Sequence, residues 1–285
     1  MTTPQTIVVT GGAGFIGSHL CEVLAKAGHK VISLDNYFTG SRDNHVEGVE
    51  YRQGHTKDIA KHIRETPDII YHLGEYSRVA KSLEEPELVW DLNMDGTFGV
   101  LEFWRKKKCK LVYAGSSTKF ESRDNAPYTW GKAANAELVA NYSRWYDLPY
   151  STVYFYNVYG PGERSGVAQY GTVIETFKQN YLQDSPHEIR GTGEQTRAFT
   201  HVADTIEGML LVGERGERDE YAICANDAHS LVEVAKLFSG EVVHLPPTKT
   251  TRSSGVMDTA KIEALGWKQK HWLKDYIEEA KKEKK

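Results

Sequence analysis

The chain has 285 residues, enough for one large α/β domain or for two domains of about 150 residues each. Apolar residues make up 40% and charged residues 26%, which excludes extensive disorder, and the net charge of −4 argues against a general nucleic-acid binder. The apolar run at residues 221–225 is far too short to span a membrane, and residues 1–5 lack the basic region of a signal peptide. Three scattered cysteines are too few for a disulfide framework or a zinc site, so we expect a cytoplasmic protein with reduced thiols.

Short apolar runs that alternate with longer helical patterns indicate the fold class. The expected strands are residues 7–10, 31–35, 51–53, 69–73, 110–114 and 151–154. Their lack of polar alternation is typical of parallel strands that are covered on both faces. The expected helices are residues 15–27, 87–106 and 132–146, and the second carries one apolar stripe formed by Trp90, Met94, Thr97, Leu101 and Trp104. This alternation predicts an α/β fold of the Rossmann type, a doubly wound parallel sheet.

The pattern weakens after Pro161 into glycine-rich loops and shorter elements. We therefore expect a large domain over residues 1–160 and a smaller, substrate-binding lobe over residues 161–285. A strand and a helix are expected to be exchanged between the two parts.

A glycine-rich turn follows the first expected strand and opens the first expected helix. Gly11, Gly14 and Gly17 fit the spacing G-x-x-G-x-x-G, and Gly12 takes the first place in the alternative spacing G-x-G-x-x-G. Glycines allow a tight turn and a close approach of the backbone to a pyrophosphate, and the helix N-terminus offers unpaired N–H groups. Asp35 ends the second expected strand, where a carboxylate hydrogen-bonds the adenosine ribose and repels a 2′-phosphate. The sequence therefore predicts a site for NAD rather than NADP.

A tyrosine and a lysine, Tyr128 and Lys132, lie four positions apart at the start of an expected helix. This spacing places both on one face, so that the ammonium lies near the phenol and favours its ionised form. The hydroxyl cluster Ser116–Thr118 follows the expected strand 110–114, at the edge of a parallel sheet where ligands bind. Together these residues predict a general base beside a cofactor.

With these features in this order, the chain resembles the extended short-chain dehydrogenase/reductase superfamily. More narrowly, it resembles the NAD-dependent sugar-nucleotide epimerase/dehydratase family, over nearly its whole length. Further matching segments are residues 34–40, 72–73, Asn93 with 96–97, 156–161, 191–193, 197–204, Arg252 and 265–267.

The resemblance implies a role for each matching residue. Tyr128 would be the base, Lys132 would tune it and hold the nicotinamide ribose, and Ser116 would hydrogen-bond the sugar, with Ser117 beside it. The residues expected at NAD are Gly11, Gly14, Phe15, Ile16, Gly17, Asp35, Asn36, Asp58, Leu73, Asn93 and Lys132. Those expected at the sugar nucleotide are Glu75, Thr118, Asn157, Arg197 and Arg252. Arg197 also suits a diphosphate on chemical grounds, because a guanidinium binds it bidentately. The eleven histidines show no metal-ligand spacing, so no metal is expected.

Three features depart from the usual pattern of the family. Only 12 positions separate Ser116 from Tyr128, where relatives have a longer segment that forms part of the pocket wall. Gly131 stands where relatives often carry Ser or Thr before the lysine. Gly74 and Glu75 replace a usual pair of alanines, and Glu75 is interpreted either as a solvent-facing loop carboxylate or as a substrate contact.

The resemblance implies a 4-epimerase that inverts C4 of a UDP-hexose or UDP-hexuronate through a transient 4-keto intermediate. The alternatives are a lyase, either a 4,6-dehydratase or a UDP-glucuronate decarboxylase, and a non-catalytic NAD-sensing protein. The intact Tyr128–Lys132 pair weighs against the sensor. Lyases of the family carry carboxylates at or near the position after the strand-end hydroxyl, where this chain has Ser117 and Thr118. Because elimination needs an acid and a base beyond the tyrosine, the sequence favours epimerisation.

The helices expected at residues 87–106 and 132–146 carry apolar groups on more than one face. These include Leu92, Phe98 and Phe103 in the first helix, and Leu138, Val139, Tyr142, Trp145 and Tyr146 in the second. A helix that is apolar over most of its circumference needs a second partner besides its own sheet. Since members of the family commonly pair through these two helices, we expect a homodimer with two-fold symmetry.

Overall fold

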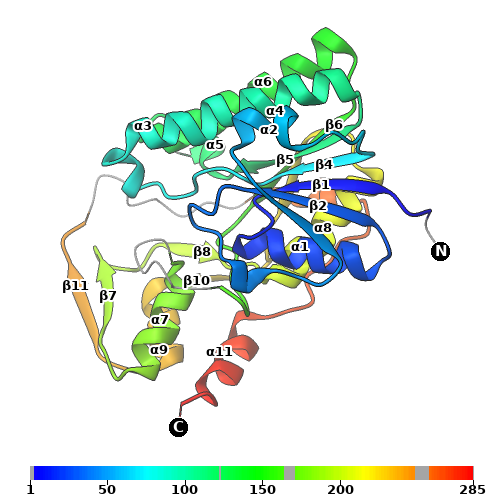
Figure 1. The fold of residues 1–285 in the computed structure, drawn as a ribbon. Helices are drawn as coiled ribbons and strands as arrows, with labels where there is room; N and C mark the ends of the chain where they lie inside the picture. The colour runs from blue at the N-terminus through cyan, green and yellow to red at the C-terminus, as the bar shows by residue number, and fades with distance from the viewer. Residues whose placement is uncertain (1–2, 122, 164–170, 248–256, 285) are drawn as a thin grey trace.

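A seven-stranded parallel sheet forms the centre of the protein, in the order β3-β2-β1-β4-β5-β6-β9. Figure 1 labels its strands β2, β1, β4, β5 and β6. The computed structural model describes residues 3–121, 123–163, 171–247 and 257–284. The strands are β1 (Thr6–Thr10), β2 (Lys30–Asp35), β3 (Val49–Gln53), β4 (Ile69–His72), β5 (Lys110–Ser116), β6 (Tyr150–Phe155) and β9 (Arg218–Ile223). The doubly wound Rossmann-type sheet predicted from the sequence is confirmed. The strand order reverses between β1 and β4, and ligands bind at such a switch point, outside the carboxyl ends of the strands.

Helices cover both faces of this sheet (Figure 1). α1 (Phe15–Lys26) and α8 (Val202–Arg215) pack on one face, and α2 (Ile59–His62), α4 (Gly96–Lys107) and α6 (Pro127–Tyr146) pack on the other. The middle of β1 is apolar because both faces of the sheet are covered. Ile7 and Val9 belong to the core under α1 and α8, and Val8 belongs to the core under α4 and α6. The three cysteines are free and buried, as expected.

The chain after residue 161 contributes to both parts of the molecule. It supplies α8 and β9 to the large sheet, and it also builds a smaller lobe beside that sheet (Figure 1). In this lobe β7 pairs with β11 in parallel, and β8 pairs with β10 in antiparallel. The elements of the lobe are α7 (Val173–Leu182), β7 (His187–Arg190), β8 (Thr196–Ala198), β10 (Ala228–Ser230), α9 (Leu231–Phe238), β11 (Val242–Leu245) and α11 (Leu273–Lys281). α10 (Ala260–Glu263) packs against β9.

The helix expected at residues 87–106 is interrupted by a π-helical turn. α3 (Pro86–Val89) leads into this turn at Trp90–Asp95, and α4 follows directly. A π turn is wider than an α turn, so residues before it face a different direction from the one a regular helix would give them. Trp90 is therefore 54% exposed, although Leu101 and Trp104, which the sequence places in the same stripe, are buried. The prediction of one continuous stripe was wrong at this point.

None of the helices that the structure describes is long and apolar enough to cross a membrane. Within the same residues, no group of three or more His, Cys, Asp or Glu side chains is placed to hold a metal ion.

Candidate active site

A cavity of about 700 Å³ opens at the switch point of the sheet. It extends from the glycine turn after β1 past the ends of β4 and β5 to β8 in the smaller lobe. Of the predicted site residues, those that line it are Gly11, Gly14, Phe15, Ile16, Gly17, Asp35, Asn36, Leu73, Glu75, Ser116, Ser117, Tyr128, Lys132, Asn157 and Arg197. Asp58, Asn93 and Thr118 are described but do not line it, and Arg252 lies outside the described residues.

The glycine turn has the shape of a phosphate cradle. Gly11 has φ +74°, and a Cβ there would approach the backbone of Gly74 to 2.9 Å. A Cβ on Gly17 would lie 2.1 Å from the carbonyl oxygen of Gly11. The first backbone bond of α1 runs from Ser18 N–H to Gly14 O, so the N–H groups of residues 15–17 have no partner within the helix. These N–H groups at the positive end of α1 fit the pyrophosphate of a dinucleotide.

Asp35 lies at the carboxyl end of β2 and supports the same turn. Its carboxylate accepts hydrogen bonds from Ala13 N–H (2.9 Å) and Tyr37 N–H (2.8 Å). Burial raises the pKa of Asp35, and the two N–H donors oppose this rise. Each carboxylate oxygen keeps a further lone pair, so the group can still accept from ribose hydroxyls.

Tyr128 and Ser116 both line the cavity and contact each other. Helix α6 begins at Pro127, where a proline is favourable because the first N–H of a helix needs no partner. This start places Tyr128 in the first turn, and its hydroxyl donates to Ser116 Oγ over 3.2 Å. Ser116 ends β5, and its Oγ also hydrogen-bonds Thr118 Oγ1 at 2.9 Å. A tyrosine hydroxyl that shares a hydrogen bond with a serine in a cavity can exchange a proton with a bound hydroxyl group.

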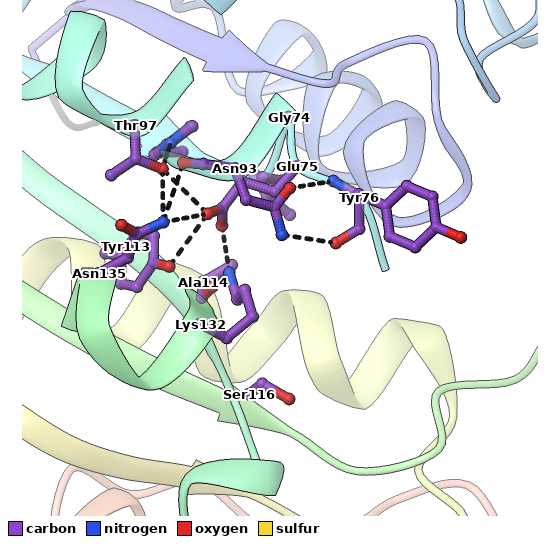
Figure 2. Close-up of polar contacts among 12 residues, drawn as sticks. Gly74, Glu75, Tyr76, Asn93, Thr97, Tyr113, Ala114, Ser116, Lys132 and Asn135 are labelled. Carbon is purple, nitrogen blue, oxygen red and sulfur yellow. Dashed lines mark hydrogen bonds and ion pairs between the residues drawn. The ribbon is translucent and has the colours of Figure 1, made fainter. Parts of the chain in front are cut away.

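Lys132 lies one turn further along α6 and is paired with Glu75. Its ammonium donates to the Glu75 carboxylate and to Ala114 O. The same carboxylate accepts from Thr97 Oγ1 (2.9 Å), Tyr113 Oη (3.1 Å) and Asn135 Nδ2 (3.1 Å), as Figure 2 shows. Sequence reasoning identified Glu75 as unusual but did not identify these partners. The sequence position of Asn135 could have indicated its place near Lys132, because residues three apart share one face of a helix.

The residues that do not line the cavity have structural contacts. Asn93 Nδ2 donates to Tyr76 O, and Tyr76 N–H donates to Asn93 Oδ1, so the side chain holds the loop after β4. Asp58 forms an ion pair of 2.8 Å with Lys61. Thr118 is fully buried beside Ser116. Asn93 and Thr118 thus hold Tyr76 and Ser116, which line the cavity.

The smaller lobe supplies the far end of the cavity. Asn157, in the loop after β6, has φ +35° and donates from Nδ2 to Ala198 O at 2.8 Å. This bond fixes the loop against β8, which carries Arg197. Glu163 also lines this end, and Thr172 donates to both of its carboxylate oxygens at 2.7 Å. Sequence reasoning did not single out Glu163.

Comparison with known proteins agrees with this geometry. A model of the NAD dependent epimerase/dehydratase family matches residues 7–224. A putative UDP-glucose 4-epimerase of Methanocaldococcus jannaschii is 30% identical over 95% of this chain and 95% of its own length. A UDP-N-acetyl-alpha-D-glucosaminuronate decarboxylase of Bacillus cytotoxicus is 30% identical over 84% of this chain and 83% of its own. The crystal structure of UDP-glucose 4-epimerase with UDP-glucose from Thermotoga maritima has a TM-score of 0.89 at 26% identity, covering 97% of each chain.

The cofactor prediction and the family prediction are both confirmed by these matches. The family is NAD-dependent, and the glycine turn and Asp35 described above lie within the matched residues. NAD is therefore the cofactor, and the chain is a member of the NAD-dependent epimerase/dehydratase family.

Proposed function

We propose that this protein is a nucleotide-sugar 4-epimerase, which inverts C4 of a UDP-hexose or UDP-hexuronate through a transient 4-keto intermediate. When bound, NAD would accept a hydride from C4 and return it to the same carbon. Tyr128 takes the proton of the C4 hydroxyl and returns it after the sugar has turned, and Ser116 hydrogen-bonds the same oxygen. Asn157 and Arg197, at the far end of the cavity, hold the nucleotide diphosphate.

The observation that carries this proposal is the hydrogen bond between Tyr128 and Ser116. The two residues that follow Ser116 in the chain cannot act as acids. Ser117 and Thr118 follow Ser116, and neither hydroxyl has an acidity suited to proton transfer at neutral pH. Among the described residues that line the cavity, the carboxylates are Asp35, Asp43, Glu75 and Glu163. Asp35 and Asp43 lie at or after the end of β2, Glu75 is paired with Lys132, and Glu163 is bound by Thr172. This arrangement supports a reaction that needs the tyrosine alone.

The experiment is incubation of the purified protein with UDP-hexoses and UDP-hexuronates, followed by nuclear magnetic resonance of the products. We expect reversible interconversion of C4 epimers and no net formation of NADH. The Tyr128→Phe variant, prepared in the same way, controls for contaminating epimerases.

The second candidate is a lyase, and the decarboxylase relative at 30% identity favours it. Glu163 is the carboxylate that this reaction would use, because burial raises its pKa toward the range of a general acid. Release of CO₂, or accumulation of a 4-keto-6-deoxy sugar, in the same incubation would establish the lyase instead.

We further propose that the protein forms a homodimer through α4 and α6. Phe98 on α4 and Trp145 on α6 are 53% and 56% exposed, and Tyr146 is exposed next to Trp145. Leu92, Phe103, Val139 and Tyr142 are buried within the chain, so the exposed aromatic residues are the ones left for a partner. Large exposed apolar groups on adjacent helices are typical of protein interfaces.

Replacing both Phe98 and Trp145 by glutamate is expected to convert the dimer to a monomer, because two charges on each chain would enter an apolar interface. Light scattering during size exclusion measures the mass. The matched control is Trp272→Glu, since Trp272 is exposed to a similar extent but lies at the start of α11. A monomeric mass for the unchanged protein at micromolar concentration would contradict the proposal.

A further inference from the structure

The carboxylate of Glu75 is enclosed by four protein donors on three different elements. Its side chain is 3% exposed. It accepts from Thr97 on α4, Tyr113 on β5, and Asn135 and Lys132 on α6, while Glu75 itself lies in the loop after β4 (Figure 2). A buried carboxylate with this many donors is held in its ionised form.

The same contacts fix the ammonium of Lys132. An ammonium has three N–H donors, and here one is directed to Glu75 and one to Ala114 O. The ring of Tyr113 lies 4.4 Å from Nζ and adds a cation–π contact. One donor is therefore left to reach toward the cavity, which Lys132 lines together with Tyr128.

The net charge around Lys132 follows from the protonation states of Glu75, His72 and Tyr113. Burial tends to raise the pKa of Glu75, but the Lys132 ammonium and the Thr97 hydrogen bond hold it below its ordinary value. Burial lowers the pKa of His72 to about 4, so this imidazole is uncharged at neutral pH. Burial and the nearby Glu75 raise the pKa of Tyr113 well above its ordinary value, so this phenol is also uncharged. At neutral pH, Lys132 and Glu75 thus form a pair with no net charge beside Tyr128.

We propose that Glu75 is a positioning residue for the active-site lysine, which it holds in place and whose charge it offsets at Tyr128. The inference rests on the proposed function only in that Tyr128 is the base. A lysine without a counter-charge would stabilise the phenolate more strongly. Removal of the Glu75 carboxylate is therefore expected to favour the phenolate of Tyr128 through the uncompensated Lys132 ammonium.

The test is the ionisation of Tyr128 in Glu75→Gln and Glu75→Ala. Glutamine keeps the shape and an acceptor for Lys132 but removes the charge. Alanine removes both, and it is the residue that resemblance to the family leads one to expect at this position. We expect the ionisation midpoint to fall by at least about one pH unit in both variants, because a unit charge within about 12 Å contributes that much at an effective dielectric constant near 20. The ultraviolet absorbance of tyrosinate measures it, as the difference between each variant and the same variant carrying Tyr128→Phe.

Two controls separate charge from structure. Glu75→Asp keeps the charge and should leave the midpoint close to that of the unchanged protein. Glu207→Gln, on α8, removes the carboxylate of an exposed ion pair with Lys270 and should have no effect on the midpoint. Thermal unfolding of each variant shows whether it is folded. If Glu75→Gln does not fold, Glu75→Ala is the variant that tests the inference.

An unchanged midpoint in the folded Gln or Ala variant would overturn the inference, and so would an Asp variant that shifts as far as the Gln variant. The absorbance titration needs no substrate, so it remains decisive if no UDP-sugar is epimerised. If epimerisation is observed, the acid limb of the pH profile of kcat/KM should move down by the same amount in the Gln variant. A fall in kcat without this movement would indicate a structural role alone.

Discussion

The Tyr128→Phe variant is expected to turn over about 10²–10⁴ times more slowly than the unchanged protein, the range typical of a lost general base. Phenylalanine keeps the ring and its packing in the first turn of α6 but removes the oxygen that donates to Ser116. NAD should remain bound, because its pyrophosphate is expected at the N-terminus of α1, which this change does not touch. The measurements are the initial rate with the UDP-sugar that the panel identifies and the NAD content of the purified variant.

The matched control is Tyr142→Phe, which removes a tyrosine hydroxyl from the same helix. Tyr142 donates to Glu102 on α4 at 3.1 Å and does not line the cavity that the described residues form. Its loss should change turnover little. Near-normal turnover in Tyr128→Phe would show that the proton is transferred by another group, and the mechanism proposed above would then fail.

The sheet and the cofactor end of the site were predictable because their signals are local. Each of the six strands expected from the sequence overlaps an observed strand. For five of them the reason is that a parallel strand covered on both faces is largely apolar, whereas the edge strand β3 has no buried residue. The glycine turn was predictable for a similar reason: Gly11 and Gly17 occupy positions where a Cβ would meet backbone. Such constraints act within a few residues and leave a pattern in the sequence.

The π turn and the Glu75 network were not predictable because their causes are not local. Trp90 lies in the expected apolar stripe, but the wider turn at Trp90–Asp95 rotates it to the surface. Glu75 follows a strand in a loop, where a carboxylate is usually solvated. Its partners come from elements that are between 22 and 60 residues away in the sequence, and only the packing of α4 and α6 over β5 brings them together.

Replacing Gly17 by alanine is expected to weaken NAD binding by about 10- to 100-fold. A Cβ at this position would lie 2.1 Å from the carbonyl oxygen of Gly11, so α1 and the turn after β1 must move apart. Overpacking of this kind costs about 1–3 kcal/mol, and here it displaces the N–H groups that face the pyrophosphate. Calorimetric titration of the NAD-free protein measures the Kd, and the NAD content after purification provides a second readout.

Gly131→Ala is the matched control, because Gly131 is also a helical glycine beside a residue of the site. A Cβ there would lie 3.4 Å from the sulfur of Met94, which is ordinary contact with a flexible side chain. Alanine is the better helix former by about 0.5–1 kcal/mol, so this variant should unfold at a slightly higher temperature and bind NAD as before. If both variants bound NAD equally well, the close approach of α1 to the glycine turn would not be what forms the pyrophosphate site.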